Sequence, residues 1–178
     1  EIIKNMKALG YKKIITTPHI MSHRFPNRKD NILAGCELVK NELSKQNIDI
    51  ELQAAAEYYF DEYFIEKIRE KDLLTFGDNY VLFELSYTST PFGLEQIVFE
   101  LLQSGYKPIL AHPERYTYYS SSLEKYAGLK DMGLLFQINL NSLHKFYGAK
   151  PKLAAEYLVN NGLVDFVGSA IHAMKYFD

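Results

Sequence analysis

The chain has 178 residues, a hydrophobic fraction of 47% and a formal net charge of −2. These values predict one globular domain spanning residues 1–178 and lack the basic excess typical of nucleic-acid-binding proteins. We expect neither a transmembrane segment nor a signal peptide, because no apolar run approaches the roughly 20 residues of a membrane-spanning helix. Cys36 is the single cysteine, which excludes a disulfide framework and a cysteine-rich zinc site and favours a cytoplasmic location.

The first half of the chain alternates apolar strands with amphipathic helices. Residues 1–10 have the pattern of a helix end without an N-cap before it, so we expect an element upstream. Residues 12–17 are β-branched and predict a buried strand, and residues 30–46 repeat apolar side chains at helical spacing. Residues 47–56 alternate and end in three alanines before Glu57, which predicts a strand with room beside its end.

The second half continues this alternation. Further helices are predicted at 61–71, 93–104, 122–132 and 150–161, and further strands at 80–85, 109–111, 134–141 and 163–168. Strands and helices that alternate in this way imply parallel strands with right-handed crossovers, in an open doubly wound sheet or a barrel. Because no strand is followed by a glycine-rich dinucleotide or phosphate-binding fingerprint, the nucleotide-binding open sheet is disfavoured.

Side chains suited to metal binding lie at or just after the carboxyl ends of the predicted strands. They are His19, Glu57, Glu84, His112, Asn139 or Asn141, and His172. In a closed parallel barrel these strand ends converge on one face, where such folds place their chemistry. The mixed nitrogen and oxygen donors suit Mn²⁺, Zn²⁺ or Fe²⁺ better than a thiolate-bound metal. Each residue taken singly is as consistent with a structural role, but together they favour a metal site.

The run from Leu110 to Tyr116, Leu-Ala-His-Pro-Glu-Arg-Tyr, has the strongest site character. Pro113 prevents a helix from starting at His112, so the strand ends by presenting an imidazole. Neutral His112 can bind a metal, and Arg115 can hold a phosphate or carboxylate with two parallel N–H bonds. The alternative is a capped strand end whose polar side chains only fix a loop. Glu84 favours the first interpretation, because a carboxylate in such an apolar strand needs a cation or hydrogen-bond donors.

Six segments along the chain together carry a family resemblance. They are Thr17-Pro18-His19, Ala56-Glu57-Tyr58-Tyr59, Leu82-Phe83-Glu84, Leu110 to Tyr116, Gln137-Ile138-Asn139 and Phe166 to His172. In this order they resemble the motifs of the polymerase and histidinol phosphatase (PHP) superfamily, in particular its branch of bacterial capsule-biosynthesis tyrosine phosphatases. The resemblance covers nearly the whole chain, and the run ending at Tyr116 is fairly specific to that branch.

The resemblance implies a distorted seven-stranded (β/α) barrel of the PHP type with up to three divalent metal ions, usually manganese. It also implies a metal-dependent phosphomonoesterase that acts on the phosphotyrosine tail of a bacterial tyrosine kinase of capsule or exopolysaccharide biosynthesis. The implied nucleophile is a metal-bridging hydroxide. The implied metal ligands are His19, Glu57, Glu84, His112 and His172, with Glu57 bridging two metals.

Catalysis is assigned to Arg115 and His172, and substrate binding to Arg115, Tyr116 and Arg24. Packing at a barrel rim is the simpler interpretation of the tyrosines, and a solvated loop is the simpler interpretation of Arg24. Cys36 lies in the middle of a predicted helix among apolar residues, which does not suit a nucleophile.

The sequence departs from the family pattern in two ways. The sequence begins after the place of a first strand that carries a His-x-His pair, and Ala170 stands where the family has an aspartate ligand. We therefore expect fewer or weaker metal sites and little activity from these residues alone. The alternatives are a small-molecule phosphatase of the histidinol-phosphate type and an inactive barrel that binds a phosphorylated tail. The sequence is also compatible with a homo-oligomer.

Overall fold

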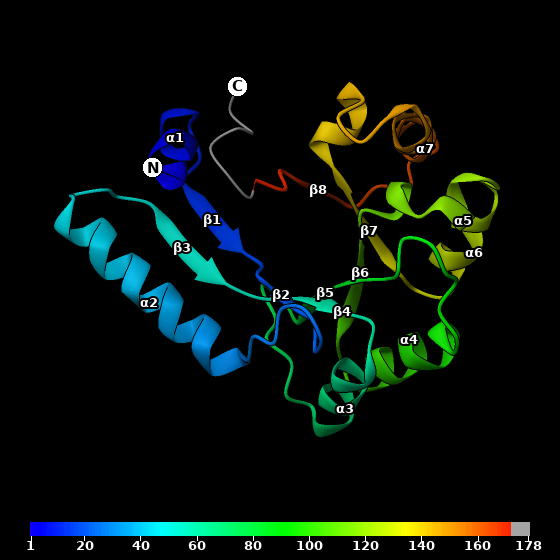
Figure 1. Ribbon diagram of the computed structural model, residues 1–178, viewed down its shortest axis with the longest axis horizontal. Helices are drawn as coiled ribbons and strands as arrows, with labels where there is room; N and C mark the ends of the chain where they lie inside the picture. The colour runs from blue at the N-terminus through cyan, green and yellow to red at the C-terminus, as the bar shows by residue number, and fades with distance from the viewer. Residues whose placement is uncertain (172–178) are drawn as a thin grey trace.

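The computed structural model describes residues 1–171 (Figure 1). Its strands are β1 (Lys13–Thr16), β2 (His19–Ile20), β3 (Glu51–Ala54), β4 (Glu57–Tyr59), β5 (Tyr80–Glu84), β6 (Lys107–Ala111), β7 (Leu135–Asn139) and β8 (Phe166–Gly168). Its helices are α1 (Ile2–Ala8), α2 (Lys29–Lys45), α3 (Glu62–Glu70), α4 (Leu94–Gln103), α5 (Thr117–Ser120), α6 (Lys125–Asp131) and α7 (Ala149–Asn160), with 3₁₀ turns η1 (Pro113–Arg115) and η2 (Leu140–His144). No helix within this described part is both long and apolar enough to cross a lipid bilayer.

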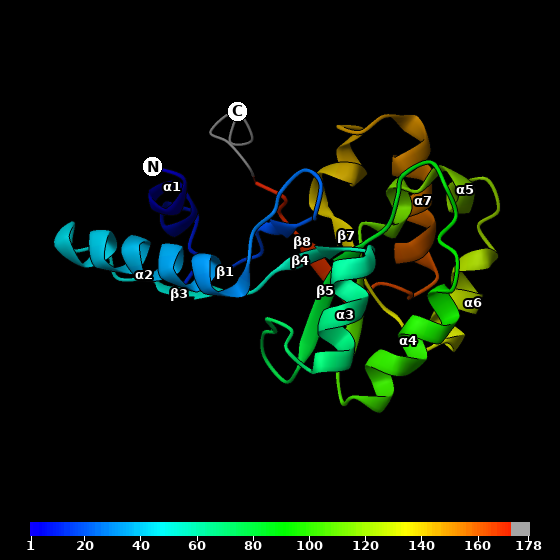
Figure 2. The ribbon, with the colours of Figure 1, turned by 60° about the horizontal axis from the view of Figure 1, so that its bottom comes forward.

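The main sheet has six parallel strands in the order β2-β4-β5-β6-β7-β8. This order follows the chain without reversal, which is the arrangement of a barrel wall and not of a doubly wound open sheet. Helices α3 to α7 lie along one face of the curled sheet (Figures 1 and 2). The predicted parallel α/β arrangement of the barrel type is therefore confirmed, as a curled half-barrel within residues 1–171.

The two predicted N-terminal strands, 12–17 and 47–56, correspond to β1 and β3, and each is followed by a short strand, β2 or β4, that was not predicted. Thr16 lies opposite Ala54 in the β1–β3 pair, and His19 lies opposite Glu57 in the β2–β4 pair, so both pairs share one register. Pro18 lacks an N–H group and falls at the break, where its carbonyl oxygen still accepts a hydrogen bond of 3.1 Å from the Glu57 amide. Strands β1 and β3 thus continue beyond the main sheet and form an arm with α1 and α2 (Figure 2).

Side chains of the central strand β5 alternate between two apolar layers. Val81 and Phe83 point to the larger layer, which is closed by helices including α4, where Ile97, Val98 and Leu101 are buried. Leu82 points to the opposite, inner layer with Ile109 and Ala111. Because alternation has a period of two residues, Glu84 shares the inner side with Leu82. The register continues this inner row from Leu82 through Glu57 to His19.

The boundaries differ from the sequence prediction mainly in the second half. The predicted strand 134–141 ends at Asn139, because the residues after it turn into η2. The predicted strand 163–168 is reduced to β8, and the segment before it is a loop. The short helix α5 was not predicted, since four residues carry too little periodicity to identify a helix.

Tyr58 provides a test of the larger apolar layer. Its side chain is 1% exposed, and its hydroxyl oxygen accepts a 2.7 Å hydrogen bond from the Leu74 amide. Burial raises the pKa of Tyr58 from 10.0 to about 12. Because the folded state holds the phenolic proton more tightly than the unfolded state, this group's contribution to stability is complete below pH 10 and is lost as the pH rises toward 12. We expect wild type to lose roughly 2 to 3 kcal/mol more than Tyr58→Phe over that interval.

Urea unfolding of wild type and Tyr58→Phe at neutral and alkaline pH measures this difference. At neutral pH the variant should be less stable by about 1 to 3 kcal/mol, because the buried Leu74 amide loses its acceptor. The exposed Tyr11 gives a matched control, since Tyr11→Phe removes a hydroxyl that carries no such role. Equal behaviour of the two variants would contradict the proposed role of the Tyr58 hydroxyl.

Candidate metal and phosphate site

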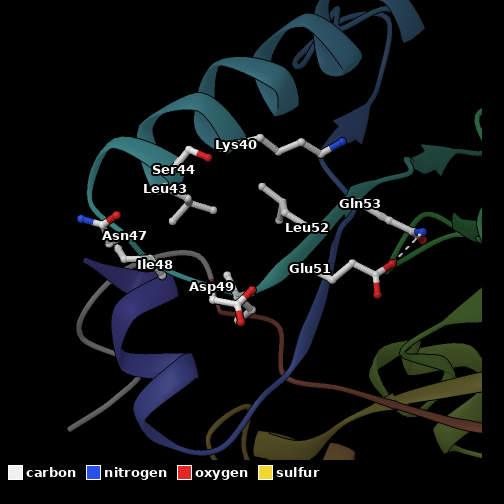
Figure 3. Close-up of a pocket in the computed structure, with 10 residues that line it drawn as sticks. Lys40, Leu43, Ser44, Asn47, Ile48, Asp49, Glu51, Leu52 and Gln53 are labelled. Carbon is white, nitrogen blue, oxygen red and sulfur yellow. Dashed lines mark hydrogen bonds between the residues drawn. The ribbon is translucent and has the colours of Figure 1, made fainter.

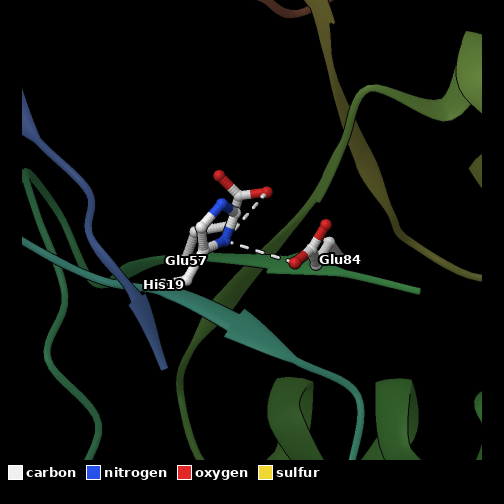
Figure 4. A group of neighbouring side chains, drawn as sticks. All are labelled: His19, Glu57 and Glu84. Carbon is white, nitrogen blue, oxygen red and sulfur yellow. Dashed lines mark ion pairs between the residues drawn. The ribbon is translucent and has the colours of Figure 1, made fainter. Parts of the chain in front are cut away.

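Four of the predicted ligands meet where neighbouring strands converge. His19 and Glu57 open β2 and β4, Glu84 closes β5, and His112 follows β6. Nδ1 of His19 lies 3.2 Å from Oε1 of Glu84 and 4.0 Å from Oε1 of Glu57 (Figure 4). Nε2 of His112 lies 3.0 Å from the same Glu57 oxygen and 3.5 Å from Oε2 of Glu84. The two carboxylates therefore face one point, with an imidazole on each side.

The electrostatics of this cluster favour cations. Glu57 and Glu84 are only 9% and 3% exposed, so their charges are poorly screened by water. The hydrogen bond to Glu84 is the largest cause that raises the pKa of His19, and the charge of Glu57 adds to it, while burial and Arg24 act in the opposite direction. The two carboxylates thus favour the protonated form of the His19 imidazole.

The same donors fit a divalent metal ion. One ligand atom each from His19, Glu57 and Glu84 lies within 4.8 Å of the others. Carboxylate oxygens combined with imidazole nitrogens are a donor set for Mn²⁺, Zn²⁺ or Fe²⁺. A metal would compete with the proton on His19, because a metal-bound imidazole must be neutral. The donor set supports a metal site without selecting one metal.

His112 is held in an uncommon backbone conformation. Its φ of 36° and ψ of 54° lie in the left-handed region, which is sparsely populated by residues other than glycine. Its amide donates a 2.6 Å hydrogen bond to the carbonyl of Gln137 on β7. Such conformations persist where surrounding contacts enforce them, and they are concentrated at functional sites. The loop after β6 thus fixes the His112 ring against Glu57 and Glu84.

Tyr116 packs against this loop. Its side chain is fully buried, and its hydroxyl donates to the carbonyl of Ala111 at 2.9 Å and accepts from the amide of Leu85 at 3.0 Å. The ring centroid of Tyr116 lies 5.7 Å from that of His112. Tyr116 was predicted to contact the substrate, but its hydroxyl is already hydrogen-bonded to backbone groups. Its position instead suits a role in supporting His112.

Glu114 is a site-supporting residue that the sequence prediction missed. It is fully buried, and its Oε1 accepts hydrogen bonds from the Asn139 amide at 3.0 Å and the Ser142 hydroxyl at 2.6 Å. Burial raises the pKa of the Glu114 carboxyl, and the two donors act against this shift. Glu114 thereby joins η1, which carries Arg115, to η2. In the sequence, the only sign of this supporting role is the position of Glu114 between His112 and Arg115.

Arg115 has two aromatic neighbours. Its Cζ lies 4.7 Å from the ring centroid of Tyr87 and 4.1 Å from that of Tyr147. No carboxylate within residues 1–171 forms an ion pair with it. Its guanidinium charge is therefore not neutralised by a described acidic side chain.

The other predicted site residues lie at the margin of the cluster or beyond it. Arg24 is exposed, and its Cζ lies 5.3 Å from the ring of Phe25, which stacks on His19 at 5.4 Å. Asn139 is buried, with its backbone amide bound to Glu114, so this hydrogen bond gives no sign of a ligand role for its side chain. His172 lies outside the described residues. Ala170, which follows β8, has a φ of 49°.

A separate hollow lies on the arm and contains none of these residues (Figure 3). It is lined by Lys40, Leu43 and Ser44 of α2 and by residues 47–53 of the following loop and β3. Since it offers no imidazole, it lacks the donor set of the cluster at the strand ends. The chemistry of the chain therefore belongs to the cluster and not to this hollow.

Comparison with known proteins agrees with the fold. The family model for capsular polysaccharide synthesis, CpsB/CapC, matches residues 1–176. The chain is 26% identical over 175 residues to the putative tyrosine-protein phosphatase CapC of Staphylococcus aureus, covering 98% of this chain and 69% of the relative. It is 29% identical over 171 residues to the tyrosine-protein phosphatase CpsB of Streptococcus pneumoniae, covering 92% and 70%.

A solved structure shares the same architecture. It comes from work on YwqE from Bacillus subtilis and CpsB from Streptococcus pneumoniae, described as unique metal-dependent tyrosine phosphatases. The TM-score is 0.88 at 26% identity, with 98% of this chain and 71% of that chain covered. Fold and cluster thus define a PHP-type barrel with a candidate metal site. The chain belongs to the CpsB/CapC family of capsular polysaccharide synthesis, so the family predicted from the sequence motifs is confirmed.

The role of Glu114 leads to a stability prediction for Ser142. Replacing Ser142 by alanine removes one of the two described donors to a fully buried carboxylate. We expect the free energy of unfolding to fall by about 1 to 3 kcal/mol. Ser121→Ala is the matched control, because Ser121 is exposed. Thermal or urea unfolding measures both variants, and equal stability would contradict a joining role for Glu114.

Proposed function

We propose that this chain carries the catalytic site of a cytoplasmic, metal-dependent phosphomonoesterase that hydrolyses phosphotyrosine. The observation that carries the proposal is that His19 and His112 both contact the carboxylates of Glu57 and Glu84, beside an arginine that is not ion-paired to a described carboxylate. Membership of the CpsB/CapC family and the names of its relatives support phosphotyrosine as the substrate. The chain spans 66 to 73% of the length of the first relatives compared, so the partners of the whole protein are inferred.

Each part of the site has a role in this proposal. His19, Glu57, Glu84 and His112 would hold divalent metal ions, with manganese as the proposed metal and His172 as a further ligand. When bound, these ions would supply an activated water nucleophile and Lewis-acid stabilisation of the phosphoryl group. Arg115 would bind the phosphoryl oxygens and neutralise the charge that develops on them. The proposed substrate is the phosphotyrosine tail of a bacterial tyrosine kinase in capsule biosynthesis.

The role of Arg115 is tested by its truncation to alanine. We expect Arg115→Ala to lower kcat/KM for p-nitrophenyl phosphate by roughly 10²- to 10³-fold, because a preorganised donor to the developing charge is lost. Steady-state kinetics with manganese measures this change. Arg28→Ala is a matched control, since the Arg28 guanidinium lies 4.1 Å from the ring of Tyr63, a packing like that of Arg115 on Tyr147. Equal activity of the two variants would remove Arg115 from the proposed site.

Ala170 leads to a prediction of increased activity. Its φ of 49° is a conformation that aspartate adopts more readily than alanine. An aspartate there, following β8, would add an anionic oxygen donor of the kind that hard divalent cations prefer. We expect Ala170→Asp to raise both manganese content and p-nitrophenyl phosphate turnover. Metal analysis and kinetics check this, with Ala170→Asn as the uncharged control. Equal manganese content in all three proteins would contradict it.

Ala170 also favours a second candidate, an inactive barrel that binds a phosphorylated tail. Binding of a phosphotyrosine peptide without turnover, persisting in Ala170→Asp with manganese, would select this alternative. The alternative of a small-molecule phosphatase is distinguished from the proposed tyrosine phosphatase by comparing turnover of a phosphotyrosine peptide with that of histidinol phosphate.

A further inference from the structure

Tyr87 lies between the cluster of candidate metal ligands and Arg115. It lies three residues after Glu84, in the loop that leads from β5 to α4. Its ring stacks on His112 with centroids 5.5 Å apart and planes inclined by 24°. The guanidinium of Arg115 lies 4.7 Å from the same ring. One side chain therefore contacts both a candidate metal ligand and the candidate phosphate-binding residue.

The hydroxyl of Tyr87 points to the cluster. It lies 3.4 Å from Oε2 of Glu84 and 3.5 Å from Nε2 of His112. These distances are longer than those of strong O–H hydrogen bonds, so the hydroxyl contributes less to the position of the ring than the stacking does.

The backbone around Tyr87 is tied to the segment that follows Arg115. The carbonyl of Tyr87 accepts hydrogen bonds from the amide of Thr117 at 3.3 Å and from its hydroxyl at 3.0 Å. The Tyr118 hydroxyl donates to the carbonyl of Ser86 at 2.8 Å. The loop after β5 and the segment after β6 therefore hold each other in place. A ring on the first loop can consequently position a side chain on the second.

Aromatic packing suits an arginine that must bind an anion. A carboxylate partner would neutralise the guanidinium and occupy its N–H groups, whereas rings contact its faces and leave the N–H groups in the plane free. Tyr87 and Tyr147 supply such rings at 4.7 and 4.1 Å from Arg115 Cζ. This arrangement preserves the bidentate geometry with which arginine binds phosphate.

We propose that Tyr87 is a positioning residue whose ring holds the Arg115 guanidinium beside the candidate metal ligands, where it can bind a phosphoryl group. The proposal rests on the proposed function and adds to it a residue on the loop after β5. It requires that Tyr87 acts through Arg115, so that its effect disappears when Arg115 is absent.

A double-mutant cycle tests this dependence. The manganese-loaded full chain is compared as wild type, Tyr87→Leu, Arg115→Ala and the double variant. Calorimetry measures binding of inorganic phosphate, kinetics give KM and kcat for p-nitrophenyl phosphate, and metal analysis gives the manganese content. We expect Tyr87→Leu to weaken phosphate binding and raise KM roughly 5- to 30-fold without loss of manganese. In the Arg115→Ala background the same substitution should change phosphate affinity by less than about twofold.

Two further variants complete the test. Tyr87→Phe keeps the ring and removes the hydroxyl, and it should bind phosphate within about threefold of wild type, in keeping with a weak hydroxyl contact. Tyr63→Leu removes a ring that stacks on Arg28 outside the site, and it should leave phosphate binding unchanged.

Several results would overturn the proposal. Wild-type phosphate affinity in Tyr87→Leu would exclude the positioning role, and so would an equal loss in both backgrounds. If Tyr87→Leu does not fold, a tenfold loss of phosphate affinity in manganese-replete Tyr87→Phe would refute positioning by the ring. These failures leave the proposed function intact when Arg115→Ala is still impaired. Unchanged phosphate binding and turnover in Arg115→Ala would reject both.

Discussion

Two buried carboxylates that face one point, Glu57 and Glu84, impose the main constraint on this structure. Both are charged side chains of low exposure, and bringing two such groups together is unfavourable unless cations lie between or beside them. The described structure places imidazoles there, with His19 on one side and His112 on the other. Divalent metals satisfy the same requirement more fully, because each carries two positive charges and accepts both nitrogen and oxygen ligands.

The curled parallel sheet brings these residues together. Parallel strands in chain order bring their carboxyl ends to one edge, and the register places His19 beside Glu57. The larger apolar layer between sheet and helices gives that edge its rigidity, since Tyr58, Phe64 and Phe83 stack within it. The cluster thus depends on packing that lies on the opposite face of the strands. Substitutions there act on the site indirectly, through the positions of strand ends.

The sequence predicted the strand-based half of the site because the strands carry periodic signals. Apolar runs identified β5 and β6, and polar residues at their ends identified Glu84 and His112. The short strands β2 and β4 escaped prediction, because segments of two or three residues carry too little periodicity to identify a strand. Glu114 and Tyr87 escaped for a different reason. Their roles arise from contacts across 25 or more residues, and no local spacing encodes such contacts.

Different interactions therefore position the two halves of the proposed site. The proposed metal-binding half takes its geometry from strand register, which is fixed by backbone hydrogen bonds along the whole sheet. The proposed phosphate-binding half takes its geometry from loops, which are joined by hydrogen bonds such as those from Ser142 to Glu114 and from Tyr118 to Ser86. The loops carrying Tyr87, Arg115 and Tyr147 are therefore where substrate preference can change without a change in strand register.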